Sequence, residues 1–257
     1  MKISIIIPTF NYDKYIARAI RSCIGQSFPK KDFEIVVVND SSKDSTKFIL
    51  ESYGSWIRVM ENKENRGLPY SRNKGISNAN GEFIVNLDAD DYLHQEFLAL
   101  CHLHMFFNKC DAVATDYFIV DDSEKIMRRL NVHEEPIACG IMFRREQMMD
   151  VGLYDAALRV AEDVDFRIRF ERKYKIQRID LPLYRYRVHK HNLTLDEMRN
   201  QRYLDKVGKK NRCEIKHSYM APEFSNDRRL DSSDKGEVTS AAELTGWDFQ
   251  IPSEKEI

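Results

Sequence analysis

The first half of the chain alternates apolar runs with segments whose apolar residues recur at helical spacing. The runs are rich in β-branched residues and predict strands buried on both faces, and the segments between them predict amphipathic helices. The expected strands are residues 3–8, 33–38, 57–60 and 83–87; the expected helices are residues 11–27, a segment capped by Ser42 or Asp44 with Phe48 turned inward, and residues 68–79. This alternation predicts an α/β domain with a mainly parallel central sheet flanked by helices.

The second half is less regular. We expect helices at residues 96–107, 143–151 and 162–174, strands at 112–120 and 176–180, and an irregular or edge segment at 182–188 because of its proline. Beyond Lys206 the apolar periodicity fades, and residues 216–257 hold nine acidic and five basic residues with little aliphatic mass. Such a composition is typical of a weakly ordered or surface-packed tail. We therefore expect one domain, residues 1–215, followed by a polar acidic tail, residues 216–257.

Composition narrows the class of protein. The 257 residues include 40 Lys and Arg against 41 Asp and Glu, and this balance argues against a nucleic-acid-binding protein. The five scattered cysteines form no C-x-x-C pair, which suits a reducing cytoplasm and excludes a disulfide scaffold or a cysteine-rich zinc module. No apolar stretch approaches the ~20 residues of a membrane span, and the first apolar run is too short for a signal peptide. We expect a soluble, cytoplasmic protein.

Polar residues collect where three expected strands end, at residues 8–11, 39–42 and 88–91. In an open parallel sheet the ligand crevice lies beyond the carboxyl ends of the strands, so the three clusters predict one shared site. Helix capping is the alternative, because Asp and Ser after a strand often start the next helix. Capping accounts for Ser42 or Asp91 singly but not for three coincident clusters.

The run Asp88-Ala89-Asp90-Asp91 is the sharpest of these features. Two carboxylates two residues apart at a strand end can reach one divalent ion and a bound diphosphate together. Oxygen ligands favour Mg²⁺ or Mn²⁺, with substrate phosphates completing the coordination shell. Acidic turns are common, so the weight of this motif comes from its position directly after a buried strand.

The motifs together resemble the family 2 glycosyltransferases, in the family's order and over about residues 1–190. The segments that carry the resemblance are residues 5–11, 37–46, 65–67, 71–75 and 88–91. The resemblance implies an inverting sugar transferase with the GT-A nucleotide-sugar-binding fold. It also implies a nucleoside-diphosphate sugar donor, most often a UDP-sugar, a hydroxyl of a glycan or lipid-linked molecule as acceptor, and Mn²⁺ or Mg²⁺ as cofactor. One departure is Ser41, where the family usually has glycine.

The resemblance also assigns residues to the donor. The donor-binding residues it implies are Pro8, Thr9, Asn11, Asp40, Arg72, Asp88, Ala89 and Asp90. Asp40 would accept an N–H from the edge of the base, a task that suits a carboxylate because it only accepts hydrogen bonds. Arg72 would lie near the base or diphosphate, where a planar guanidinium stacks or makes paired bonds; a solvated helix arginine is the alternative. Asp88 would bind the ribose or its surroundings.

Later positions are assigned to the chemistry. By the resemblance Asp163 is the general base that takes the proton of the acceptor hydroxyl, and Asp90 and His189 ligate the metal. Acids that merely favour a helix N-terminus are the alternative for Asp163, and a structural histidine is the alternative for His189. The resemblance places four further residues near the acceptor or the diphosphate: Glu162, Asp91, Arg187 and Lys190. A place in the first turn of a helix is the alternative for Glu162, and a helix start is the alternative for Asp91.

Other functions fit less well. A sugar nucleotidyltransferase usually presents a glycine-rich loop after the first strand, and residues 8–12 contain no glycine. A non-catalytic sugar-nucleotide or glycan-binding module would have no need of the retained acids. The sequence lacks the dinucleotide-binding motif G-x-G-x-x-G and the P-loop motif G-x-x-x-x-G-K-[ST], which argues against a Rossmann dehydrogenase and against a kinase. The basic run from Lys206 to Lys216 is either a solvated face or a contact with the cytoplasmic side of an anionic membrane.

Overall fold

The structure is a computed structural model that describes residues 2–158, 160–190, 192 and 197–212, with the backbone alone at 197–201. The chain divides into two units, Met1–Pro222 and Glu223–Ile257, and all described residues lie in the first. The expected tail at residues 216–257 lies outside the described residues, so the boundary at residue 215 stays a prediction.

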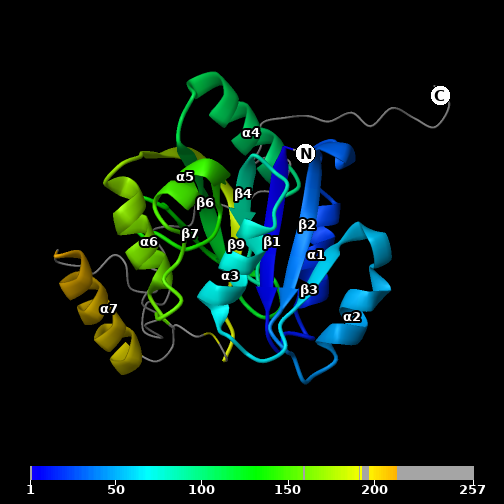
Figure 1. Ribbon diagram of the computed structural model, residues 1–257. Coiled ribbons are helices and arrows are strands. Elements are labelled where there is room, and N and C mark those ends of the chain that lie inside the picture. The colour runs from blue at the N-terminus through cyan, green and yellow to red at the C-terminus, as the bar shows by residue number, and fades with distance from the viewer. Residues whose placement is uncertain (1, 159, 191, 193–196, 213–257) are drawn as a thin grey trace, which may run out of the picture. The chain divides into compact units, whose positions relative to one another are not determined.

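A nine-stranded sheet forms the centre of this unit, in the order β3-β2-β1-β4-β8-β6-β9-β5, with β7 paired to β6 (Figure 1). The strands are β1 (Ile3–Thr9), β2 (Phe33–Asn39), β3 (Arg58–Glu61), β4 (Phe83–Asn86), β5 (Tyr92–Leu93), β6 (Ala112–Val120), β7 (Ile126–Leu130), β8 (Ile141–Arg144) and β9 (Ile176–Arg187). Strands β1 to β4 run parallel, as do β6 and β9, while β8 runs antiparallel between β4 and β6. The mixed α/β architecture with a mainly parallel sheet is confirmed.

Helices cover the sheet on both faces. They are α1 (Ile16–Ile24), α2 (Thr46–Ser52), α3 (Leu68–Ser77), α4 (Phe97–Asn108), α5 (Arg145–Asp150), α6 (Glu162–Glu171) and α7 (Glu197–Asn211), with the short 3₁₀ turns η1 (Lys30–Asp32) and η2 (Gly54–Trp56). Ile5 and Ile7 of β1 belong to the core shared with α1 and α4, whereas Ile6 belongs to the core shared with α3 and α6. Because both faces of β1 are covered, its sequence is continuously apolar instead of alternating.

Helix α3 lies unusually close to β1. A Cβ atom at Gly75 would lie 2.5 Å from Cγ2 of Ile6, so only glycine permits this approach. Arg72 is one turn earlier on the same helix and is 1% exposed. The close packing at Gly75 therefore brings a charged side chain under the carboxyl edge of the sheet, where the candidate site lies.

Several local predictions were wrong. Phe143 does not start a helix: it is part of β8, where its ring packs 5.6 and 5.0 Å from those of Phe166 and Phe170, and α5 follows. Residues 182–188 are not an irregular edge, because β9 runs through Pro182 between β6 and β5, and register shifts in the pairing with β6 accommodate the proline. Phe48 points outward and is 73% exposed.

Candidate active site

The carboxyl ends of β1, β2 and β4 lie at one edge of the sheet. Thr9, the last residue of β1, pairs with Asn39, the last residue of β2, and β4 runs parallel on the other side of β1. The three polar clusters therefore share this edge, as expected. Pro8 and Thr9 are buried, and the Thr9 hydroxyl has no hydrogen-bond partner within the described part of the chain. We call this edge, with the loops that follow β1, β2, β3 and β4, the donor edge.

Asp40 fastens the loop after β3 to the donor edge. Its Oδ1 accepts hydrogen bonds from Nδ2 of Asn62 at 2.7 Å and the amide of Arg66 at 2.9 Å, and its Oδ2 accepts one from the amide of Gly67 at 2.8 Å. Asp40 is 3% exposed. A carboxylate offers about four acceptor positions, and these bonds occupy three of them.

The turns after β1 and β2 interlock through their polar groups. The amide of Asn11 donates to Oγ of Ser42 at 3.0 Å, and Oδ1 of Asn11 accepts from the amide of Lys43 at 2.7 Å. Asn11 and Ser41 both have left-handed backbones, with φ of 58° and 66°. Ser41, which stands where glycine is usual, thus keeps the conformation that glycine adopts most easily.

Arg72 joins two carboxylates from distant parts of the chain. Its Nη2 donates to Asp88 at 2.6 Å and its Nη1 to Glu162 at 2.7 Å, while its guanidinium lies 5.5 Å from the ring of Tyr154 and contacts Sγ of Cys139. Burial alone would lower the pKa of Arg72, but the carboxylates raise it well above its usual value. The alternative of a solvated helix arginine is wrong, because Arg72 is a buried cation held between Asp88 and Glu162, whereas its contact with a base or diphosphate stays a prediction.

Asp90 and His189 meet side by side. Nε2 of His189 lies 2.9 Å from Oδ2 of Asp90, and both residues are buried. Burial raises the pKa of Asp90, the hydrogen bond with His189 lowers it, and the nearby charge of Asp88 raises it again, so that the net direction is upward. The ring of Tyr15 stacks on that of His189 with 4.6 Å between centroids. The two residues predicted to share a metal are therefore adjacent, and Ala89 beside them is buried.

Asp91 ties the acidic turn to β9. It accepts a hydrogen bond from the Tyr184 hydroxyl at 2.5 Å and another from the amide of Arg187 at 2.7 Å. Burial and the neighbouring Asp90 raise the pKa of Asp91 well above its ordinary value. The alternative of a helix start is wrong, because β5 follows this residue directly.

Arg187 is held by protein groups. Its Nε donates to the carbonyl of Asp90 at 2.9 Å and its Nη2 to Glu124 at 3.0 Å, and its guanidinium lies over the rings of Tyr15 and Tyr92. The side chain is 3% exposed. A contact between Arg187 and a diphosphate stays a prediction, as does one from Lys190, which is exposed.

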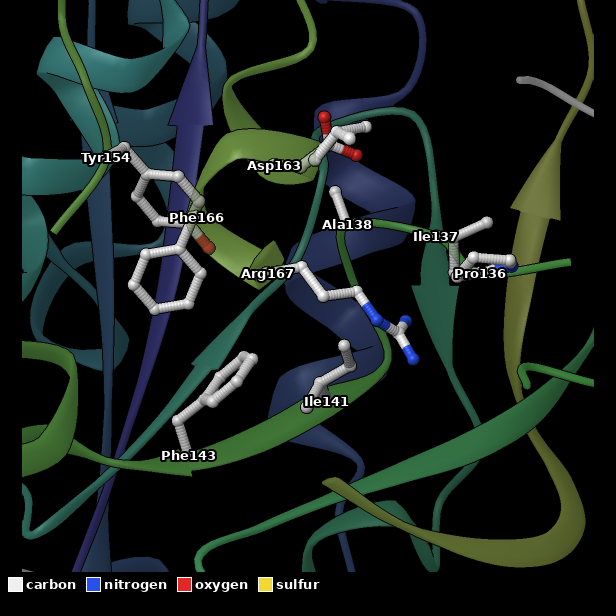
Figure 2. A pocket seen from close by; sticks show the side chains of 10 residues that line it. Pro136, Ile137, Ala138, Ile141, Phe143, Tyr154, Asp163, Phe166 and Arg167 are labelled. Carbon is white, nitrogen blue, oxygen red and sulfur yellow. The ribbon is translucent and has the colours of Figure 1, made fainter. Parts of the chain in front are cut away.

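Glu162 and Asp163 open helix α6 and have different surroundings. Burial raises the pKa of Glu162 to about 7, with Arg72 opposing and Asp163 adding to the shift. Burial also raises the pKa of Asp163, against the lowering effect of Arg72. Asp163 is partly exposed and lines a pocket (Figure 2). Of the two acids, Glu162 is held by an ion pair and Asp163 reaches the pocket.

A family model described as Glycosyl transferase family 2 matches residues 4–161, more than half of the chain. The chain belongs to glycosyl transferase family 2. Its fold is the GT-A fold of these enzymes, as its likeness to solved transferases also shows.

Several curated proteins are similar to this family 2 chain. The poly(ribitol-phosphate) β-N-acetylglucosaminyltransferase TarS of Staphylococcus aureus is 43% identical over 101 residues, which are 38% of this chain and 18% of TarS. The poly(ribitol-phosphate) β-glucosyltransferase of Bacillus spizizenii is 41% identical over 102 residues, 38% of this chain and 16% of the relative. The chain thus matches less than a fifth of the length of either protein.

Solved structures extend the likeness. The structure of S. aureus TarS 1–349 in complex with UDP has 27% identity and a TM-score of 0.64, over 73% of this chain and 61% of that one. The mannosyltransferase PcManGT of Pyrobaculum calidifontis, in complex with GDP-Man and Mn²⁺, has 18% identity and a TM-score of 0.66, over 86% of this chain and 66% of that one. The second likeness concerns the fold alone.

The family 2 site holds two side chains suited to a metal. No group of three His, Cys, Asp or Glu with metal-binding geometry occurs among the described residues. Asp90 and His189 nevertheless point a carboxylate oxygen and an imidazole nitrogen at each other, a donor set that suits Mn²⁺ when substrate oxygens complete the shell. The donor types present, one carboxylate oxygen and one imidazole nitrogen, are therefore chemically compatible with a divalent ion.

Sequence reasoning missed the acids that bind Arg187 and Tyr15, the two side chains that contact Asp90 and His189. Glu124, in the turn before β7, accepts bonds from Arg18 and Arg187, and Asp122 accepts one from the Tyr15 hydroxyl at 2.9 Å. Only the acidic composition of residues 121–124 could have drawn attention to them. Their partners lie about 100 and about 60 residues away, beyond the reach of local patterns.

A second cluster, also missed, anchors the segment between β7 and β8. Asp116 of β6 accepts bonds from Arg178 at 2.7 Å, Arg129 at 2.9 Å and the amide of Val132 at 3.3 Å. Burial would raise the pKa of Asp116, but the hydrogen bonds from Arg178 and Arg129 lower it to about 2. The start of segment 131–140 is thereby fixed to the sheet.

The basic run at the C-terminal side is only partly described. Lys210 pairs with Asp155 at 2.7 Å and Asp165 at 2.9 Å, whereas Lys206 and Lys209 are exposed on α7. Lys216 lies outside the described residues. Within the part that the structure describes, no helix has the length and apolar content to cross a membrane.

Proposed function

We propose that the chain is an inverting glycosyltransferase. It moves a sugar from a nucleoside-diphosphate sugar, by preference a UDP-sugar, to a hydroxyl of a glycan or lipid-linked acceptor, with the help of Mn²⁺ or Mg²⁺. The observation that carries the proposal is the buried Arg72, which holds Asp88 of the donor edge and Glu162 of α6 in one network. UDP bound to the TarS structure supports the choice of nucleotide.

The donor edge binds the nucleotide. Asp40 accepts the N–H of the base with the acceptor position left by its three internal bonds. The buried Thr9 hydroxyl supplies a further polar group in the wall. Asp88, which is 28% exposed and oriented by Arg72, offers its carboxylate to the ribose. A divalent ion held by Asp90 and His189 would neutralise charge that develops on the leaving diphosphate.

Asp163 accepts the proton. As the acceptor oxygen bonds to the anomeric carbon, its proton passes to the Asp163 carboxylate, and the bond from that carbon to the nucleoside diphosphate breaks on the opposite face. Asp163 suits this role better than Glu162, because Arg72 occupies the Glu162 carboxylate while Asp163 reaches the pocket. A raised pKa also makes Asp163 a stronger base than an ordinary aspartate.

A screen of nucleotide sugars tests the proposal. Thermal stabilisation by each nucleotide sugar is measured with and without Mn²⁺, and the best donor is then incubated with a set of glycan and lipid-linked alcohols. We expect Mn²⁺-dependent stabilisation by UDP-sugars and release of UDP on transfer, with an Asp90→Ala variant as control. Donor binding without turnover on any acceptor would favour the non-catalytic module, and release of pyrophosphate from a nucleoside triphosphate would favour a nucleotidyltransferase.

Contact with an anionic membrane belongs to the same proposal where the acceptor is lipid-linked. The exposed Lys206 and Lys209 support it, at about 1 kcal/mol for each basic residue near the surface. Flotation with phosphatidylserine vesicles should decrease in a Lys206→Gln/Lys209→Gln variant. Equal flotation of that variant and the unchanged chain would refute the proposed membrane contact.

A further inference from the structure

The pocket beside Asp163 has walls of different chemistry (Figure 2). Helix α6 contributes Asp163 and Arg167, and the segment before β8 contributes the apolar side chains of Pro136, Ile137 and Ala138. Asp163 and Arg167 are four residues apart, so they lie on the same face of the helix, about 6 Å from each other at Cβ. An acid and a guanidinium therefore open onto one pocket.

Arg167 is only partly exposed, and one of its guanidinium nitrogens is buried without a hydrogen-bond partner among the described residues. Its Nε donates to Glu171 at 2.9 Å, but its buried Nη1 has no hydrogen-bond partner among the described residues. The side chain is only 12% exposed. In an ordinary surface ion pair at this spacing, N–H groups that the partner leaves unbound donate to water. A buried N–H without an acceptor loses its hydrogen bond to water and so carries a free-energy penalty.

Arg167 pairs with Glu171 and not with Asp163, so the Asp163 carboxylate and part of the Arg167 guanidinium are available to a ligand. Arg167 turns toward Glu171, one turn further along α6, and is not paired with Asp163, one turn earlier. Figure 2 shows its side chain reaching from α6 toward Pro136, Ile137 and Ile141. A planar guanidinium offers paired N–H groups that match phosphate and carboxylate oxygens.

We propose that Arg167 binds an anionic group of the acceptor. The acceptor would then be an alcohol that carries a phosphate or a carboxylate about one helical turn from its reacting hydroxyl. This inference rests on the proposed function, because Asp163 marks the position of the reacting hydroxyl. The apolar side chains of Pro136, Ile137 and Ala138 exclude water from the contact and strengthen it.

Equilibrium binding of small probes tests the inference without turnover. With the donor site filled by UDP and Mn²⁺, dissociation constants are measured by ligand-observed NMR for two matched pairs: glycerol 3-phosphate with glycerol, and methyl glucuronide with methyl glucoside. In the unchanged chain we expect at least one anionic probe to bind about tenfold more tightly than its neutral counterpart. The pair that shows the preference identifies the anion as phosphate or carboxylate.

Variants assign the preference to Arg167. Arg167→Met keeps the aliphatic stem and should abolish the preference, Arg167→Lys should keep part of it, and Arg21→Met, at an exposed arginine of α1, should leave it unchanged. Glu171→Gln, which removes the competing partner, should preserve or increase it. If Arg167→Met unfolds at a much lower temperature, the preference for the anionic probe is compared between Arg167→Lys and Glu171→Gln. A lower preference in Arg167→Lys than in Glu171→Gln would still assign it to Arg167.

Two results would overturn the inference: an equal preference in Arg167→Met, or no anionic preference in the unchanged chain. Failure of the proposed function has a different signature. It would show as absent donor turnover with every acceptor, whatever the probes bind.

Discussion

The donor edge and the acceptor side of this molecule are built in different ways. At the donor edge, short loops bond to one another through backbone amides, as Asn11 does with Ser42 and Lys43. On the proposed acceptor side, which comprises α6 and residues 136–141, the main contact with the rest of the molecule joins side chains 90 residues apart, Arg72 of α3 and Glu162 of α6. The first region joins the ends of neighbouring strands through contacts that span 31 and 32 residues, whereas the contact between Arg72 and Glu162 spans 90, so strand order alone predicts more of the first region than of the second.

The largest effect should follow from removing the base on the acceptor side. Asp163→Asn should lower the rate of transfer about 10³-fold, within the range for general base catalysis, because amide nitrogen and oxygen take no proton at neutral pH. Donor affinity, measured by thermal stabilisation with UDP and Mn²⁺, should not change. Asp150→Asn, at an exposed carboxylate of α5, is the control. Normal turnover by Asp163→Asn would contradict the assignment.

Breaking the link between the two regions should cost stability. Arg72→Met leaves Asp88 and Glu162 without their cation and should lower the free energy of unfolding by about 3 kcal/mol, as for other broken buried pairs. The measurement is urea denaturation. Adding Glu162→Gln to Arg72→Met should recover part of the loss, because it removes the uncompensated buried charge. Strict additivity of the two changes would show that the pair is not coupled.

The pH dependence of stability should separate Glu162 from Asp116. The pKa of Glu162 is raised to about 7 in the folded chain, so its contribution to stability is present at pH 4 and is lost as the pH rises through 7, with a slope of up to about 1.4 kcal/mol per pH unit. The pKa of Asp116 is lowered to about 2, so its contribution is lost as the pH falls below 4. Urea denaturation from pH 5 to 8 should show that the free energy of unfolding decreases as the pH rises. This decrease should be smaller in Glu162→Gln. An identical slope in this variant would refute the assignment.

A change confined to the donor edge should act on the nucleotide alone. Both carboxylate oxygens of Asp40 accept hydrogen bonds from N–H groups. Asp40→Asn puts an NH₂ group in place of one of these oxygens, so a donor then faces a donor, and UDP binding should weaken about tenfold. Isothermal titration measures the affinity. Turnover at saturating donor should change little, since α6 is untouched. A loss of turnover with unchanged affinity would place Asp40 in the chemistry instead.

The smallest effect is expected at the left-handed turn. Ser41→Gly relieves the backbone at φ of 66° and should raise the free energy of unfolding by about 0.5 kcal/mol, the local strain being partly offset by the flexibility of glycine in the unfolded chain. Ser42→Gly, one residue later, should instead destabilise because it removes the acceptor for Asn11. Thermal melting compares the two. A destabilised Ser41→Gly would mean that the serine hydroxyl has a role of its own.

The same contrast explains how far the sequence could be interpreted. The buried strands, the shared edge and the acidic turn follow from apolar runs and the residues that end them, and these predictions held. Phe143 was misassigned because an apolar run of three residues, followed by Arg144, does not distinguish a strand from the start of a helix. Pro182 was misassigned because the register shifts that accommodate it involve Asp116 of another strand.

Within the site, the chemical role of a side chain was easier to predict than the side chains that it contacts. The positions of Asp90 and His189 are 99 residues apart, and only the resemblance to a family brought them together. Arg72 was expected beside the donor, but its ion pair with Glu162 depends on the close approach of α3 to β1 at Gly75. A residue type states what a side chain can do, whereas the packing of other elements determines which partner it meets.

The cluster at Asp116 has a consequence for engineering. It fixes the start of segment 131–140 to the sheet through Val132, and β8 fixes its end through Ile141. Between these anchors the segment supplies the apolar side chains that line the pocket beside Asp163, and Cys139 near its end contacts Arg72. Because both ends are anchored, substitutions at residues 136–138 should change the wall of this pocket while the segment keeps its course along the sheet.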